Sequence, residues 1–426
     1  MSCGTDIQEK VAAGDYDEAI TLVREALDDD KRNLVDPGVK QWLGLRFRNL
    51  FITQASRDKW ALDHTDSYTD VMRRISNAVP VVLPDRRSDR QRVAEAYLRG
   101  QAMAEWETEM PDAADFGVPD TTIVFAPGLI NGLLPVREFP TIFPRLARDR
   151  GWGILRIDLN PLGSSEQNVT DVGRAAFQGL GFTADLERIL EADAQPPENI
   201  VFIGYSKGTP DIMEFLVQHP EIAERTNAFI TWCGAAGGSP LVAGPYEQIK
   251  GMEFPAIPDG LSHMGEAILR VLVPFLKLDK KSLARSREFD LKGALRSLLP
   301  SVREKYLDQH AADLDALDIP ILSFTGTTDV TRVPASQIQG FLALTDLDQK
   351  NDMQLTQAAS TMSRVPMATH VARLHANHWD YSFEAWPREY RLTSPNLENR
   401  FPKESLLIAL MQLLQETGIV AERQTA

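Results

Sequence analysis

From residue 121 onward, short apolar runs alternate with stretches that carry apolar residues at helical spacing. Two parallel strands need a long crossover between them, usually a helix, so this alternation is typical of an α/β fold with a mostly parallel sheet and helices on both faces. The run 199–204 is almost continuously apolar, as expected for a central strand buried on both sides. The predicted strands are 121–126, 153–158, 199–204, 228–232, 321–325 and 370–374.

Helical spacing also predicts the elements around these strands. Helices are expected at 136–150, 184–192, 208–219 and 404–416. The alternation stops between 235 and 318, where no strand is apparent and where helices are expected at 264–276 and 291–307. An insertion so much longer than a normal connection should have structure of its own, and we expect it to form a helical cap over the sheet.

The part of the chain before the alternating region contains helical spacing but no catalytic motif. Helices are expected there at 11–27, 39–60 and 87–106. We therefore predict three parts. They are a helical N-terminal extension at 1–118, an α/β core at 119–234 and 319–426, and a cap insertion at 235–318.

Composition excludes several classes of protein. The 426 residues carry a formal net charge of -15, which repels phosphate backbones and argues against a nucleic-acid partner. Two distant cysteines make neither a disulfide framework nor a CxxC site. The N-terminus lacks the basic and apolar segments of a signal peptide, and no run approaches the roughly 18 apolar residues of a membrane span. We therefore expect a cytoplasmic protein without stable membrane insertion. The sequence leaves open whether the protein forms a homo-oligomer.

One short motif carries chemistry. The sequence Gly204-Tyr205-Ser206-Lys207-Gly208 is a G-x-S-x-G motif between an apolar run and a helical stretch, which is the context that a nucleophile elbow requires. The serine of such an elbow sits on a sharp turn, and a side chain at either glycine would collide with its neighbours. The backbone N–H of Lys207, at the helix N-terminus, can then face an oxyanion. The alternative is an ordinary strand–helix turn with a capping serine.

Residues 121–420 resemble the α/β-hydrolase superfamily. Besides the elbow, the resemblance rests on the segment 156–166, on Gly326-Thr327-Thr328-Asp329 after one strand, and on Asn377-His378-Trp379 after a later strand. The order serine, aspartate, histidine is the order found in that family.

The resemblance implies roles for particular residues. Ser206 would be the nucleophile, His378 its general base, and Asp329 the acid that orients the imidazole. The family's second oxyanion donor is a backbone N–H in the loop after the first core strand, which points to Leu129. The usual His-Gly pair of that loop is replaced here by Pro127-Gly128.

Each of these assignments has an alternative. His375 stands close to a predicted strand end and is the other candidate base, while Asp329 can also be a simple turn aspartate. The side chain of Lys207 either binds an acidic group of the substrate or points to solvent or to a nearby carboxylate.

The resemblance implies a serine hydrolase that cleaves a small-molecule carboxylic ester through an acyl-enzyme on Ser206. Apolar helical faces within 235–318 favour a hydrophobic acyl group, although they serve equally well to pack the cap. The same triad would serve a thioesterase, an amidase or an acyltransferase, and an inactive scaffold that binds a partner through its N-terminal helices is a further alternative. No metal-binding or nucleotide-binding motif occurs, so neither a metal nor a cofactor is expected.

Overall fold

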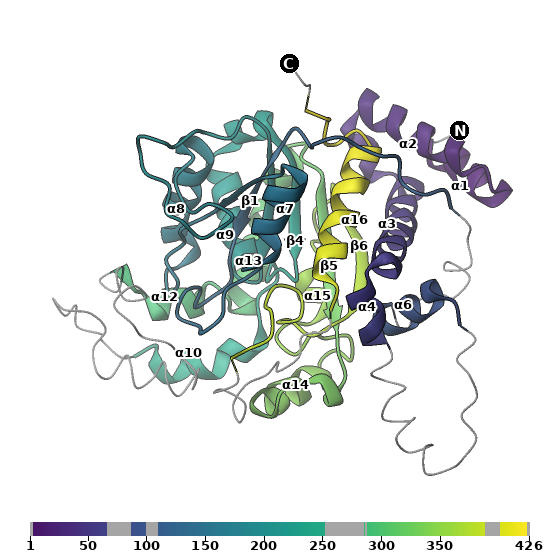
Figure 1. The fold of residues 1–426 in the computed structure, drawn as a ribbon. Coiled ribbons are helices and arrows are strands. Elements are labelled where there is room, and N and C mark those ends of the chain that lie inside the picture. The colour runs from purple at the N-terminus through teal and green to yellow at the C-terminus, as the bar shows by residue number, and fades with distance from the viewer. Residues whose placement is uncertain are drawn as a thin grey trace, which may run out of the picture.

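The computed structural model describes residues 3–65, 87–98, 110–251, 285, 288–387 and 401–423. One six-stranded sheet forms the centre, and every neighbouring pair of strands in it is parallel (Figure 1). The spatial order of the strands is β2-β1-β3-β4-β5-β6. The strands are β1 (Thr122–Ala126), β2 (Gly153–Arg156), β3 (Ile200–Tyr205), β4 (Thr226–Trp232), β5 (Ile321–Thr327) and β6 (Ala368–His375). All six predicted strands are confirmed to within two residues at either end.

The register of the central strands brings three loops to one edge of the sheet. Ala126 at the end of β1 pairs with Gly204 in β3, and Tyr205 at the end of β3 pairs with Trp232 in β4. Because parallel strands end at the same edge, the loops that follow β1, β3 and β4 lie next to one another there. Ligands of open α/β sheets bind outside this carboxyl edge.

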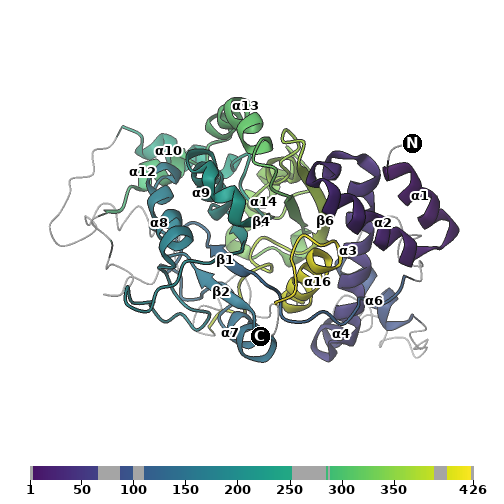
Figure 2. The same ribbon diagram turned by 90° about the horizontal axis from the view of Figure 1, so that it is seen from above.

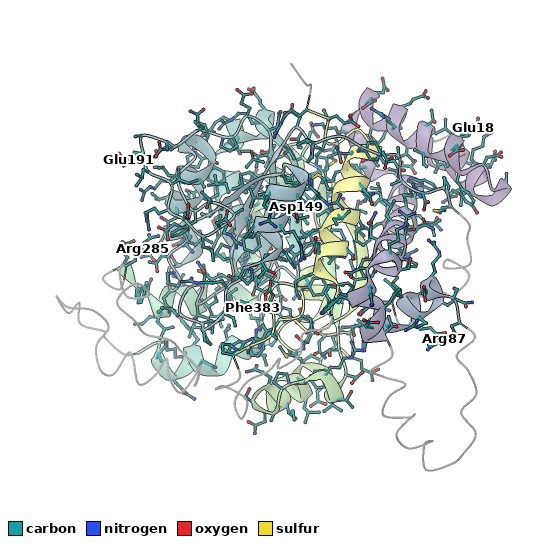
Figure 3. All side chains as sticks on the ribbon, in the orientation of Figure 1. Glu18, Arg87, Asp149, Glu191, Arg285 and Phe383 are labelled. Carbon is teal, nitrogen blue, oxygen red and sulfur yellow. The ribbon has the colours of Figure 1, made fainter. Side chains whose placement is uncertain are left out.

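Helices cover both faces of the sheet. Figure 2 shows one group on one side and a second group on the other. The first group is α8 (Ser165–Gln178), α9 (Gly208–Gln218) and α13 (Pro300–Asp315), and the second includes α7 (Ile142–Arg150) and α16 (Lys403–Glu416). The predicted helices at 208–219 and 404–416 are confirmed, whereas the helix predicted at 136–150 begins only at Ile142. Charged side chains such as Glu18, Asp149 and Glu191 point outward from this arrangement (Figure 3).

The crossover helix between β2 and β3 was predicted at the wrong place. The helix is α8, which begins with a capping box between Ser164 and Gln167 and ends at Gly179 in the left-handed conformation. Those two signals, with an apolar face that is buried, define a helix on their own. The predicted helix at 184–192 is a mostly exposed stretch of turns and bends.

The N-terminal helices are α1 (Cys3–Ala13), α2 (Tyr16–Asp29), α3 (Pro37–Arg57), α4 (Lys59–Thr65) and α6 (Asp89–Tyr97). The predicted helix at 11–27 is divided by Gly14, whose φ of 80° ends α1. The part of the predicted helix 87–106 beyond residue 98 lies outside the described residues.

Helix α3 packs against both β6 and α16, so the N-terminal helices share one apolar core with the sheet. Gly44 permits the close approach, since a Cβ there would lie 3.1 Å from the carbonyl oxygen of Val371 in β6. The buried guanidinium of Arg46 donates to the carboxylate of Glu416 in α16, with a shortest distance of 2.6 Å. Loss of either partner would leave a buried charge without compensation.

The insertion after β4 contributes α10 (Ala243–Ile249), α12 (Leu291–Arg296) and α13. Residues 297–299 separate α12 from α13, which divides the helix predicted at 291–307. The helix predicted at 264–276 lies outside the described residues. The remaining helices are short: α14 (Ile338–Thr345), α15 (Gln357–Ser360), η1 (Lys31–Val35), η3 (Pro220–Arg225), η4 (Pro240–Val242), η6 (Val330–Arg332) and η7 (Ala335–Gln337). None of the helices in the described part of the chain combines the length and apolarity that a bilayer span requires.

Candidate active site

Ser206 occupies the turn between β3 and α9, with a φ of 52° that non-glycine residues rarely adopt. The two flanking positions are glycine because neither has room for a side chain. A Cβ at Gly204 would lie 2.7 Å from the Cα of Thr209, and one at Gly208 would lie 2.2 Å from the carbonyl oxygen of Ala126. The strand–turn–helix context expected for the motif is therefore present, and its strain is of the kind found at functional sites.

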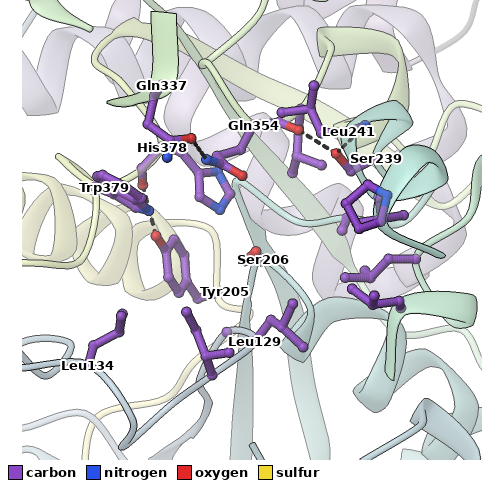
Figure 4. A pocket seen from close by; sticks show the side chains of 18 of the residues that line it. Leu129, Leu134, Tyr205, Ser206, Ser239, Leu241, Gln337, Gln354, His378 and Trp379 are labelled. Carbon is purple, nitrogen blue, oxygen red and sulfur yellow. Dashed lines mark hydrogen bonds between the residues drawn. The ribbon is translucent and has the colours of Figure 1, made fainter. Parts of the chain in front are cut away.

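A cavity of about 260 Å³ opens beside this turn. Ser206 and His378 both line it, and Figure 4 shows the imidazole and the serine hydroxyl facing the same space. The two residues come from different elements, the β3–α9 turn and the loop after β6. Most of the other lining side chains are apolar: Leu129, Ile130, Leu134, Leu241, Val242, Leu291, Leu295, Leu298, Leu355 and Phe383.

A buried carboxylate holds the imidazole of His378. Its Nδ1 lies 2.8 Å from Oδ2 of Asp352, and both side chains are almost completely buried. The other carboxylate oxygen, Oδ1, accepts from the backbone N–H groups of Gln354 at 2.9 Å and Leu355 at 2.7 Å. The backbone N–H of His378 also donates to the Asp352 carbonyl at 2.8 Å. With Nδ1 engaged in this way, Nε2 is the nitrogen left for chemistry in the cavity.

This chain is similar in structure to a metagenomic carboxyl esterase, MGS0156, with a TM-score of 0.57 and 21% sequence identity over 82% of this chain and 90% of that one. The α/β-hydrolase fold expected from the sequence is the fold observed. A lipase from Bacillus licheniformis, BlEst2 in its mature form, matches with a TM-score of 0.41 and 16% identity over 63% of this chain and 89% of that one. No family model and no curated protein matches the sequence.

Within the α/β-hydrolase fold, Asp329 does not lie where the sequence analysis expected it. Its Oδ2 is 3.4 Å from Nε2 of His375, not beside His378, and its side chain is 38% exposed. The neighbouring His375 first, and then hydrogen bonds from the hydroxyl and N–H of Thr331, lower the pKa of Asp329 well below its usual range. Asp329 was expected to pair with His378, but the carboxylate beside His378 in the structure is that of Asp352.

The position of Asp352 depends on a long-range backbone hydrogen bond that no local sequence pattern reveals. It follows α14 rather than a strand, so its sequence context does not mark it as an acid at the sheet edge. The N–H of Thr328, just past β5, donates to the carbonyl of Asn351 at 3.0 Å. That bond returns the chain to the end of β5, next to the loop that carries His378.

Cys233 follows β4 and lies behind the Asp352 carboxylate. Its Sγ, a carboxylate oxygen of Asp352 and a ring nitrogen of His378 all lie within 4.8 Å of one another. Burial first, and then the nearby Asp352, raise the pKa of this thiol well above its usual value, so the thiol is protonated and can donate to the carboxylate. The neighbouring Tyr381 hydroxyl uses its proton in a hydrogen bond to the Thr325 carbonyl at 2.7 Å, so it does not donate to this carboxylate. Cysteine, aspartate and histidine are also side-chain types that ligate zinc, so these three residues are a group that could hold a metal ion in the described part of the chain.

The loop after β1 packs directly onto the elbow of the α/β-hydrolase fold. A Cβ on Gly128 would lie 3.2 Å from Cβ of Ser206, and Leu129 follows it in the cavity wall. Within the described parts of the chain, the backbone N–H groups of Leu129 and Lys207 donate to no protein acceptor. Two such amides beside a serine are what an oxyanion hole needs.

The side chain of Lys207 is engaged elsewhere. Its ammonium is buried and bonds both carboxylate oxygens of Asp211 at 2.7 and 3.0 Å, and Asn168 donates to the same carboxylate at 2.8 Å. Desolvation lowers the pKa of Lys207, and the neighbouring Asp211 opposes that shift. Of the alternatives for this side chain, the structure shows the pairing with a nearby carboxylate, which also anchors the first turn of α9.

Proposed function

We propose that this protein hydrolyses carboxylic esters through an acyl-enzyme on Ser206, with His378 as general base and Asp352 as the carboxylate that orients it. The observation that carries the proposal is that the strained serine and the buried His378–Asp352 pair meet at one apolar cavity. A carboxyl esterase with the same fold supports the reaction class.

In the first half of the reaction, Oγ of Ser206 attacks the ester carbonyl as Nε2 of His378 takes its proton. The carbonyl oxygen becomes an oxyanion, and we assign its stabilisation to the N–H groups of Leu129 and Lys207. Asp352 accepts from Nδ1, which fixes the tautomer and stabilises the imidazolium that forms. The imidazolium then returns the proton to the leaving alkoxide, the ester C–O bond breaks, and the acyl-enzyme remains.

In the second half, a water molecule replaces the alcohol. His378 takes a proton from this water as its oxygen attacks the acyl carbon, and the same two N–H groups receive the second oxyanion. The bond between the acyl carbon and Oγ then breaks, the imidazolium gives its proton to Oγ, and the carboxylic acid leaves. Because most side chains of the cavity wall are apolar, with leucine the commonest, the acyl group it suits is a hydrophobic one.

A fluorophosphonate probe tests the nucleophile directly. We expect the wild-type protein to be labelled and Ser206→Ala to be unlabelled, with both proteins melting at similar temperatures. Absence of labelling in the wild type would instead support an inactive scaffold. A series of p-nitrophenyl esters of increasing acyl length would then define the acyl preference, and added alcohol would reveal acyl transfer as a competing outcome.

A further inference from the structure

The catalytic cavity contains a few polar side chains among its apolar ones. Apart from Ser206 and His378, they belong to Tyr205, Ser239, Gln337, Gln354 and Trp379. In a cavity of this kind, the few polar groups are what orients a ligand. Whether they remain available to a ligand depends on how the protein itself uses them.

The two hydroxyl groups are used by the protein. Tyr205 donates to the backbone carbonyl of His378 at 3.0 Å. Ser239 donates to the backbone carbonyl of Gln354 at 2.7 Å and accepts from the N–H of Leu241. Trp379 brings its ring alongside that of Trp386, with centroids 5.7 Å apart. The two glutamine amides are therefore the groups to examine.

The amides of Gln337 and Gln354 bond to each other. Nε2 of Gln354 donates to Oε1 of Gln337 at 2.7 Å. This bond leaves the Oε1 acceptor of Gln354 and the Nε2 donors of Gln337 without a protein partner among the described residues. Both side chains are half-buried, and amide groups taken from water into apolar surroundings need a partner.

The pair is held rigidly and faces a defined part of the cavity. The backbone N–H of Gln354 donates to the Asp352 carboxylate, and that of Gln337 donates to the Pro334 carbonyl. In Figure 4 the amides lie beyond His378, on the side away from Leu129, with Ser206 between. His378 hands its proton to the leaving alcohol, so a substrate places its alcohol portion on this side of the cavity.

We infer that the Gln337–Gln354 pair recognises a free hydroxyl on the alcohol portion of the substrate, which makes monoesters of diols and polyols the favoured class. A single hydroxyl can donate to Oε1 of Gln354 and accept from Nε2 of Gln337, so one group satisfies both amides. An alkyl group at that position leaves both unsatisfied. This inference rests on the proposed function, because it assigns the leaving-group side from the role of His378.

The test compares two substrates of the same shape, 2-hydroxyethyl butanoate and propyl butanoate. After correction for their rates of hydroxide-catalysed hydrolysis, we expect kcat/KM of the wild type to favour the hydroxyethyl ester by about tenfold. In Gln337→Leu and Gln354→Leu the corrected ratio should fall to near one. The ratio within one variant is independent of any general loss of activity in that variant.

The chain offers a matched control in a second glutamine pair outside the cavity. Nε2 of Gln54 donates to Oε1 of Gln412 at 2.9 Å, between α3 and α16. Gln54→Leu should keep the wild-type ratio. A wild-type ratio near one, or a ratio that survives both cavity substitutions, would overturn the inference. Activity that persists in Ser206→Ala would overturn the proposed function instead, so the two failures are separable.

Discussion

Two histidine–aspartate pairs lie close together in the sequence of this protein, and they differ in distance, in the burial of the aspartate and in the ring nitrogen that faces it. His378 presents Nδ1 to Asp352 at 2.8 Å, both groups are buried, and the histidine lines the cavity of Ser206. His375 presents Nε2 to Asp329 at 3.4 Å, and that aspartate is more than one third exposed. The two histidines are separated by only two residues in the sequence.

For the proposed catalysis, the difference that matters is the ring nitrogen that each pair leaves available and the space that this nitrogen faces. An aspartate on Nδ1 leaves Nε2 for a nucleophile, whereas an aspartate on Nε2 occupies that position. Burial adds to the contrast, because water reaches the partly exposed Asp329 and weakens its interaction with His375. The Cys233 thiol also lies close to the Asp352 carboxylate and to the His378 ring.

The strongest test removes each histidine in turn. We expect His378→Ala to lower kcat by about 10⁵-fold, because the serine loses its general base. His375→Ala should change kcat by less than about tenfold, since its ring is not part of the cavity wall. Ester hydrolysis at saturating substrate measures both. A larger loss in His375→Ala than in His378→Ala would reverse the assignment of the two pairs.

The second test exchanges the two carboxylates for amides. Asp352→Asn should lower kcat by about 10⁴-fold, because an amide N–H can stabilise the wrong imidazole tautomer. Asp329→Asn should leave kcat within about threefold of the wild type. Circular dichroism and melting temperature of both variants provide the control for folding, and equal losses in the two would show that the geometry does not distinguish them.

A smaller effect is expected from the thiol behind Asp352. Cys233→Ala removes one donor to the carboxylate and should lower kcat by about tenfold with little change in KM. Cys233→Ser restores a donor at the same position and should recover most of the loss. A serine variant as impaired as the alanine variant would assign Cys233 to packing alone.

The smallest effect concerns the pH dependence of stability at the Asp329–His375 pair. The pKa of Asp329 is lower in the folded protein than in the unfolded chain, where it is about 3.9. The contribution of this carboxylate to the free energy of unfolding is therefore present above pH 4. It disappears as the pH falls through the pKa of the folded state. Asp329→Asn should melt about 1–2 °C below the wild type at pH 6, and the gap should close at low pH. A gap that widens with acid would contradict the sign of this shift.

Much of the fold was predictable from local pattern. The six strands follow from apolar runs, and the elbow follows from two glycines around a serine, because a strand or a sharp turn is specified by a few neighbouring residues. The crossover helix could have been found as well, since Ser164, Gln167 and Gly179 mark its ends. Those end signals, together with a buried apolar face, distinguish 165–178 from the mostly exposed stretch 184–192.

What the sequence determined by itself was the parallel sheet, the strained turn at Ser206 and the placement of His378 after the last strand. What only the tertiary structure decided was the partner of each histidine, the packing of α3 on β6 and the Gln337–Gln354 pair in the cavity. The physical reason is the separation in sequence over which each kind of interaction acts. Helical spacing and turn sterics act over a few residues, whereas Asp352 reaches His378 because a backbone bond past β5 folds a distant loop onto the sheet edge.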